Sequence, residues 1–338
     1  MAALQSAVVF ADTVAADRPL SGSKRPLVSK RGKFALGFFQ PDNSQHWYLG
    51  IWYNQISKHT PVWVANRDSP IFDPESSRLT ISDEGNMVLL DRSRTEVWST
   101  NVSKIGSSST VGVILDSGNL VLADASNTSV VLWQSFDHFG NTWLPGGKLG
   151  RSKHAGGMST RLVAWKAQNN PAPGVFSLEL DPDGTNQYLL EWNRSQQYWT
   201  SGNWTGRIFT NVPEMTSTSS YPTSMYTFDY VVNGDNESYF VYDIKDDSVT
   251  TRFVVDETGR ILFLTWLKVT EEWMPFWSQP KVPCDVYSLC GRFSACTENA
   301  FASCSCLHGF SEQNTDEWLQ RDHTSGCRRN VELQHCSS

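Results

Sequence analysis

The first 283 of the 338 residues contain no cysteine, and all seven cysteines lie between Cys284 and Cys336. No apolar run reaches the ~18 residues that a membrane-spanning helix requires, so membrane attachment would need a transmembrane helix that is absent from this sequence. The formal net charge is −7, and no run is rich in Lys or Arg. These features argue against nucleic acid and anionic membrane surfaces as partners.

Catalytic signatures are also missing. The sequence holds no HExxH, GxSxG, Walker or dinucleotide-binding motif, and no kinase Gly-rich loop, HRD or DFG. The cysteines form no C-x₂-C knuckle, which disfavours zinc. "DPDGTN" (181–186) lacks the further ligands of a calcium loop and indicates a hairpin turn. We therefore predict no catalytic residue, no metal and no cofactor in this chain.

Aromatic residues, by contrast, are abundant. They make up 12% of the chain and include 14 Trp, and hydrophobic residues make up 39%. A chain of this length has room for about two or three domains with sizeable cores. Helical periodicity is weak throughout, so these cores are expected to be built from strands.

An internal repeat occupies the first part of the chain. Trp63, Trp98 and Trp133 follow one another at intervals of 35 residues, and the Gly-Asn pairs at 85–86 and 118–119 are 33 residues apart. Each unit is a turn, a short alternating strand, a polar turn and a strand that carries the Trp. Three such units are expected to pack about a pseudo-threefold axis, with the tryptophans in one shared core.

The middle of the chain also indicates β structure. "SLELDPDGTNQYLLEW" reads as two strands about a DPDG turn, and residues 238–273 read as three strands broken at "KDD" and "DETG". Residues 207–226 are rich in Ser, Thr and Pro and are expected to form a long loop. Such a loop is either a solvated connection or a recognition element.

The cysteine-dense segment is too short to bury a core of its own, so it is expected to be a disulfide module. Cys336 is left over as an unpaired cysteine. Five N-x-S/T sequons predict N-glycosylation in a secretory context, at Asn101, Asn127, Asn193, Asn203 and Asn236. Residues 1–11 are interpreted as a signal-peptide remnant or a cloning scar.

The repeats resemble the mannose-binding bulb lectins, a β-prism family whose pockets follow Gln-x-Asp-x-Asn-x-Val-x-Tyr. Amide, carboxylate and phenol groups would hold the sugar hydroxyls, and Val would contact the apolar face of the ring. The matching positions are Ser82, Glu84, Asn86, Val88 and Leu90 in one unit, and Leu115, Ser117, Asn119, Val121 and Ala123 in the next. Only Asn and Val persist in both units, so the resemblance implies the scaffold with a degenerate sugar pocket.

Longer stretches resemble the ectodomain of plant S-domain, or G-type lectin, receptor-like kinases and the S-locus glycoproteins. They are "WQSFDHFGNTWLPGGKLG" (133–150), "YWTSGNWTGRIFTNVPEM" (198–215) and "CDVYSLCGRFSACTENAFASCSCLHGF" (284–310). The family implies an all-β fold with two tandem β-prism domains, at 12–152 and 153–280. An EGF-like module at 281–330 and the start of a PAN/apple domain at 331–338 would follow. EGF-like pairing would join Cys284–Cys296, Cys290–Cys304 and Cys306–Cys327.

The resemblance also implies a function. The chain would be the extracellular ligand-sensing region of a receptor serine/threonine kinase at the plasma membrane, acting in defence or self-recognition. Its partner would be a peptide, protein or lipid signal, together with a second receptor copy or a co-receptor. ATP would be a cofactor only of the absent kinase domain. The alternatives are a lectin for mannose-type or cell-wall glycans, and a secreted decoy similar to S-locus glycoproteins.

Overall fold

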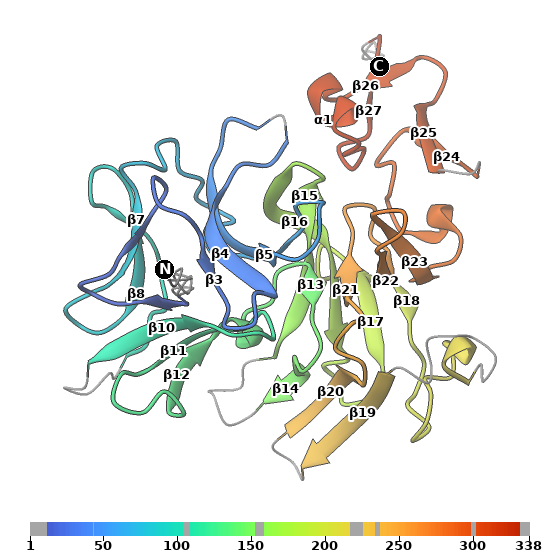
Figure 1. Cartoon of the computed structure of the whole chain (residues 1–338). Coiled ribbons are helices and arrows are strands. Elements are labelled where there is room, and N and C mark those ends of the chain that lie inside the picture. Colours follow the sequence, from blue (N-terminus) through green and yellow to red (C-terminus); the bar gives the residue numbers. More distant parts are fainter. Residues whose placement is uncertain are drawn as a thin grey trace. The chain divides into compact units, whose positions relative to one another are not determined.

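The computed structural model describes residues 12–42, 44–103, 109–152, 159–216, 226–233, 237–298 and 302–331. The sequon at Asn236, the unpaired Cys336 and residues 1–11 lie outside them. Almost all of the regular secondary structure among the described residues is β structure, as the sequence predicts (Figure 1). The chain divides into two compact units. The first runs to Phe139 and includes Leu267–Glu272, and the second contains the remainder.

The first unit holds three antiparallel sheets of four strands each. One contains β3 (Leu27–Val28), β4 (Phe34–Phe39), β5 (Tyr48–Tyr53) and β6 (Pro61–Val64). Another contains β2 (Leu20–Ser21), β7 (Arg78–Ile81), β8 (Met87–Leu90) and β9 (Glu96–Ser99). The third contains β1 (Thr13–Val14), β10 (Thr110–Ile114), β11 (Leu120–Asp124) and β12 (Val131–Gln134), and is followed by the 3₁₀ turn η1 (Ser135–Asp137).

The three tryptophans of the repeat occupy the same place in each sheet. Trp63 pairs with Ile51, and in each sheet the strand register shifts directly after the residue opposite the Trp. The ring centroids of Trp63, Trp98 and Trp133 lie 5.8, 6.0 and 5.6 Å apart in edge-to-face geometry. Indoles prefer this arrangement because the positive ring edge meets the negative ring face. The last strand of each sheet therefore contributes one tryptophan to a shared aromatic cluster.

The second unit also holds three antiparallel sheets. One contains β13 (Thr142–Trp143), β21 (Thr251–Val255), β22 (Ile261–Leu267) and β23 (Glu272–Gln279). Another contains β15 (Arg161–Ala167), β16 (Asn170–Leu180), β17 (Tyr188–Trp192) and β18 (Gln196–Thr200). The third has only three strands among the described residues: β14 (Leu149–Ser152), β20 (Glu237–Ile244) and β19 (Tyr226–Asn233). The segment predicted to be a long loop contains the 3₁₀ turn η2 (Pro213–Thr216).

The cysteine-rich segment consists of short elements. They are the turn η3 (Pro283–Asp285), the hairpin of β24 (Ser294–Glu298) and β25 (Ala302–Cys306), the helix α1 (Thr315–Leu319), and the pair β26 (Phe310–Glu312) and β27 (Cys327–Arg329). Its disulfides join Cys284–Cys296, Cys290–Cys304 and Cys306–Cys327, which are the pairs that the family resemblance implies. Within the described ranges, no helix has the length and hydropathy needed to cross a bilayer.

Candidate functional site

The two Gly-Asn turns of the lectin pattern have the same geometry. Asn86 O accepts from Ser82 N at 2.8 Å, and Gly85 N donates to Ser82 O at 2.9 Å. The turn at Gly118 and Asn119 repeats both bonds, at 2.9 and 3.0 Å. Both glycines have φ +84°, which favours glycine over residues that carry a Cβ. The turn itself therefore accounts for the Gly of both pairs.

The Asn86 side chain is bonded within the protein. Its Oδ1 accepts from Val102 N at 2.8 Å and from Thr100 Oγ1 at 2.9 Å, and its Nδ2 donates to Val102 O at 3.4 Å. These bonds join the turn before β8 to the chain that follows β9. The amide acts as a structural tie, and a sugar hydroxyl would have to compete for it.

Asn119 is tied in the same way and is only 7% exposed. Its Oδ1 accepts from Ser135 Oγ at 3.1 Å and from Phe136 N at 3.2 Å. Its Nδ2 donates to Gln134 Oε1 at 2.9 Å. Both persistent asparagines thus connect the start of one strand to the end of the next.

The other positions of the pattern do not complete a pocket. Glu84 is exposed, and its own backbone N–H and the Ser82 side chain lower the pKa of its carboxyl. Ser117 Oγ accepts from Asn119 N at 3.4 Å. Among the apolar positions, Val88, Val121 and Ala123 are buried, Leu90 is half-buried and Leu115 is 39% exposed. The Gln positions hold Ser82, whose Oγ accepts from Asn86 N at 3.3 Å, and the aliphatic Leu115, and both Tyr positions are aliphatic.

The sequons are accessible where they are described. Asn101, Asn127, Asn193 and Asn203 are all exposed. Asn203 is exposed although it lies between Trp199 and Trp204, the position at which partial burial would be expected. All four can therefore accept a glycan without disturbing a core.

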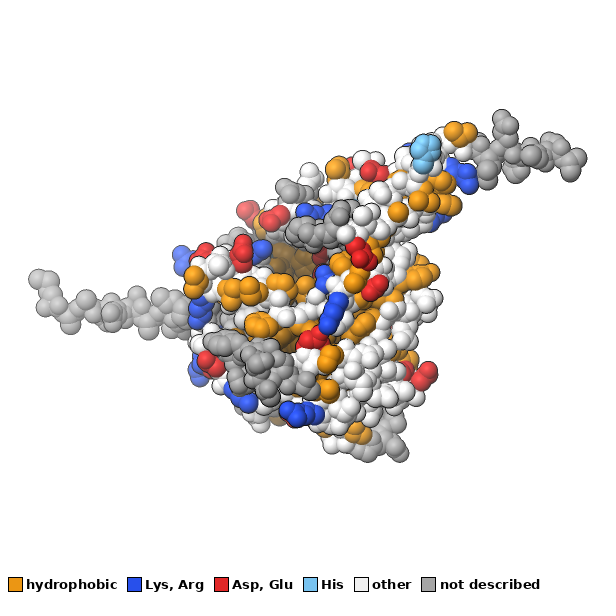
Figure 2. Space-filling model, turned by 90° about the vertical axis from the view of Figure 1, so that its right-hand side faces the viewer, with side chains coloured by type: hydrophobic (Ala, Val, Ile, Leu, Met, Phe, Trp, Pro, Cys, Tyr) orange, Lys and Arg blue, Asp and Glu red, His pale blue; other side chains and the backbone are white. Residues whose placement is uncertain are grey.

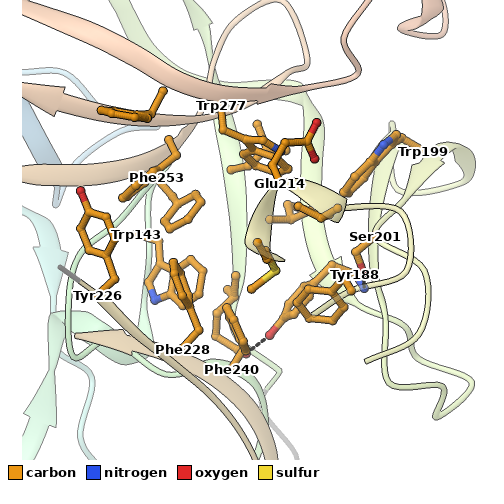
Figure 3. Close-up of a pocket in the computed structure, with 18 residues that line it drawn as sticks. Trp143, Tyr188, Trp199, Ser201, Glu214, Tyr226, Phe228, Phe240, Phe253 and Trp277 are labelled. Atoms are coloured by element: carbon orange, nitrogen blue, oxygen red, sulfur yellow. Dashed lines mark hydrogen bonds between the residues drawn. The ribbon is translucent and has the colours of Figure 1, made fainter. Parts of the chain in front are cut away.

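A second candidate site is a cavity of about 350 Å³ inside the second unit. Strands of all three sheets line it, together with η2. Most of its side chains are aromatic, among them Trp143, Tyr188, Phe228, Phe240 and Phe253, whose rings surround one space in Figure 3. Small-molecule pockets typically have volumes of roughly 300–1,000 Å³ and mostly apolar walls. The cavity meets both criteria.

Two tryptophans of the second unit line the cavity and contact each other. Trp199 pairs with Leu190 directly before a register shift, as the tryptophans of the first unit do in their sheets. Its centroid lies 6.5 Å from that of Trp277 on β23, edge to face. The third sheet has no fourth strand among the described residues and so supplies no third indole there. Two indoles thus meet at this cavity, whereas three meet in the first unit.

Most polar groups in the lining already have partners. The Tyr188 hydroxyl donates to Leu149 O, and Ser201 Oγ accepts from Tyr188 N at 2.8 Å and donates to Gly202 O at 2.9 Å. Burial raises the pKa of Tyr188 well above its usual value. These groups support the wall and are not available to a ligand.

Glu214 of η2 is the exception. Its Oε1 forms an ion pair of 2.6 Å with Lys281 Nζ, whereas Oε2 is buried without a hydrogen-bond partner, as is Nε1 of Trp277. Burial raises the pKa of Glu214, but the hydrogen bond and charge of Lys281, together with the backbone N–H of Glu214 and the indole N–H of Trp277, outweigh burial and hold the pKa below its usual value. The carboxylate therefore carries its charge at neutral pH, at the edge of the cavity beside Trp277 (Figure 3).

Sequence reasoning missed this cavity, although one signal pointed to it. Trp199 is followed two residues later by Ser201, just as Trp133 is followed by Ser135, and both serines accept from the backbone at the start of the preceding strand. The spacing Trp-x-Ser could have identified another Trp-bearing strand. The contribution of η2 has no comparable signal, because it lies in the segment read as a loop.

Comparisons with known proteins agree with this architecture. The family described as D-mannose binding lectin matches residues 60–166, and the S-locus glycoprotein domain matches residues 199–314. The chain is thus a lectin-type all-β protein. A G-type lectin S-receptor-like serine/threonine-protein kinase of Arabidopsis thaliana is 43% identical to it over 332 residues, covering 96% of this chain. Receptor-like serine/threonine-protein kinase SD1-8 of the same plant is 38% identical over 329 residues, again covering 96% of the chain.

The chain therefore belongs to the S-domain family, which includes the G-type lectin receptor-like kinases. It spans 38% of the length of each of these two relatives. Among solved structures, a lectin from Marasmius oreades aligns with 38% of this chain and 92% of its own, at 19% identity and a TM-score of 0.26.

Proposed function

We propose that the chain is the extracellular ligand-sensing region of a plant receptor-like kinase. In this role it recognises a peptide, protein or lipid signal and couples binding to receptor association and intracellular Ser/Thr phosphorylation. The observation that carries the proposal is the similarity to two receptor kinases over 96% of this chain. The absence of a catalytic motif fits a recognition role for this part of the protein.

The architecture fits the same proposal. The two three-sheet units would be tandem β-prisms, and the three disulfides would define an EGF-like module ahead of a PAN/apple domain. Disulfides persist in oxidising compartments, and four accessible sequons are expected of a chain that passes through the secretory pathway. Both features support a location on the outer face of the plasma membrane, in a defence or self-recognition receptor.

The test begins with the full-length transcript. It is expected to encode one apolar span of ~20 residues followed by a serine/threonine kinase. The full-length protein, tagged in two colours and expressed in plant cells, is then challenged with extracellular plant and microbial fractions. An active fraction should increase both crosslinking between receptor copies and kinase phosphorylation, and a kinase-dead variant should retain only the crosslinking. A transcript without a membrane span would instead favour a secreted decoy.

The carbohydrate-binding alternative has its own test. Glycan-array binding to mannose-type or cell-wall glycans, abolished by Asn86→Ala in a protein that remains folded, would favour a lectin. We expect no such binding, because internal bonds occupy the amides of Asn86 and Asn119. Each missing polar contact also removes about 0.5–1.5 kcal/mol of favourable interaction.

A further inference from the structure

We propose that the cavity of the second unit is a binding site for an uncharged, largely apolar ring molecule that carries one hydroxyl group. The proposal concerns binding alone, so it stands or falls separately from the receptor role. Three observations carry it: the volume and walls of the cavity, its access to the surface, and the two polar atoms left over at its edge.

The walls favour flat apolar molecules. The cavity of about 350 Å³ is more than twice the size of an engineered cavity of ~150 Å³ that binds benzene, so a bicyclic ring fits. Phe228 and Phe240 stack at 5.7 Å and 12°, and Trp143 lies 5.6 Å from Phe240. Aromatic faces and edges presented in this way pack well against another ring system.

The cavity is accessible at one edge. Phe276 is 39% exposed, and the Glu214 side chain is 35% exposed. Phe276 shares β23 with Met274, which is 48% exposed and does not line the cavity. The face shown in Figure 2 carries several groups of hydrophobic side chains among white and charged atoms. The exposed edge of the cavity therefore lies beside η2.

The polar atoms at the edge of the cavity favour a ligand with a hydroxyl group. Glu214 Oε2 is a buried acceptor and Trp277 Nε1 a buried donor. The indole N–H helps to lower the pKa of the Glu214 carboxyl, but no hydrogen bond of normal geometry joins the two atoms. A hydroxyl group can donate to the first and accept from the second. Among the described residues of the lining, Glu214 is the only charged side chain, and Lys281 already neutralises it from the solvent side. An anionic ligand would meet this carboxylate, and no Lys or Arg stands among the described lining residues to balance it, so a carboxylate-bearing ligand is disfavoured.

The experiment compares two probes with the same ring system, 2-naphthalenemethanol and 2-naphthoate. Titration calorimetry on the glycosylated chain is expected to show one saturable site for the alcohol and binding at least about tenfold weaker for the carboxylate. Glu214→Gln, which keeps the shape and frees Lys281, should weaken the alcohol severalfold and strengthen the carboxylate, so that the preference is lost or reversed.

A filling variant shows where the probe binds. Met215→Trp on η2 places an indole in the cavity and should reduce alcohol affinity at least about tenfold. Met274→Trp, the matched exchange outside the lining, should leave it unchanged. Circular dichroism and the thermal midpoint establish that both variants fold. The proposal is overturned if the alcohol does not saturate one site, if Met215→Trp binds as the parent does, or if Glu214→Gln leaves the preference between the probes unchanged. Receptor signalling without probe binding would refute the cavity alone.

Discussion

Replacing Asn119 by alanine tests whether the remnant of the sugar pocket serves the fold. The substitution removes bonds to Ser135 Oγ, Phe136 N and Gln134 Oε1 from a side chain that is 7% exposed. A hydrogen bond of this kind contributes about 0.5–1.5 kcal/mol, and a buried group left unpaired costs more. Because half-buried Gln134 can bond to water instead, we expect a loss of about 2–3 kcal/mol.

The assay is differential scanning calorimetry, which separates the transitions of a chain with more than one folding unit. For a unit of this size the expected loss lowers its midpoint by roughly 6–9 °C. The control is Asn54→Ala, because Asn54 is exposed and water can replace its side-chain bond from Nδ2 to Gly32 O at 3.0 Å. If Asn119→Ala melts like that control, the amide is not a structural tie and our interpretation of the pocket is wrong.

Two further predictions concern the second unit. Exchanging both Cys290 and Cys304 for alanine opens a loop with a sequence separation of 14 and should destabilise the cysteine-rich segment by about 3 kcal/mol, measured by urea unfolding under non-reducing conditions. Burial, and to a lesser extent the charge of Glu257, raises the pKa of Asp256 to about 6. The folded state therefore binds a proton at Asp256 more tightly than the unfolded state does. The protein loses this stability as pH rises from about 4 to 6. Asp256→Asn removes this dependence, so its stability relative to the parent should rise by about 2–3 kcal/mol from pH 4 to pH 7; parallel pH curves for the two proteins would contradict the assignment.

The first unit could be predicted from its sequence because each repeat is local. A Gly-Asn turn, an alternating strand and a Trp-bearing strand lie within about one repeat length, so residue spacing reports the register. The interval of 35 residues between tryptophans corresponds to one sheet, and the rings of Trp63, Trp98 and Trp133 meet as that spacing implies. The disulfide pairs could be expected only from family resemblance, because six cysteines allow many pairings.

The cavity could not be predicted, because distant parts of the chain form it. Trp143 packs edge to face on Tyr242, whose hydroxyl donates to Trp143 O at 3.0 Å across a separation of 99 residues. Periodicity carries no information about such contacts. The segment that supplies Glu214 is rich in Ser, Thr and Pro, and its composition indicates only a loop. Trp199 alone carried a signal, through its spacing to Ser201.

An unfilled cavity lowers the stability of the second unit. Residual enclosed space in a core destabilises by about 24 cal/mol per Å³, because the atoms around it lose contacts. The cavity opens to solvent at Phe276 and Glu214, so only its enclosed part carries this cost. Filling the space should therefore raise the stability of the ligand-free protein. We expect Met215→Trp to increase the thermal midpoint while weakening probe binding at least about tenfold, and Met274→Trp to change neither. A filled cavity that lowers the midpoint would mean that its walls are already fully packed. Gain of stability with loss of binding is the trade-off expected of a site kept open for a ligand.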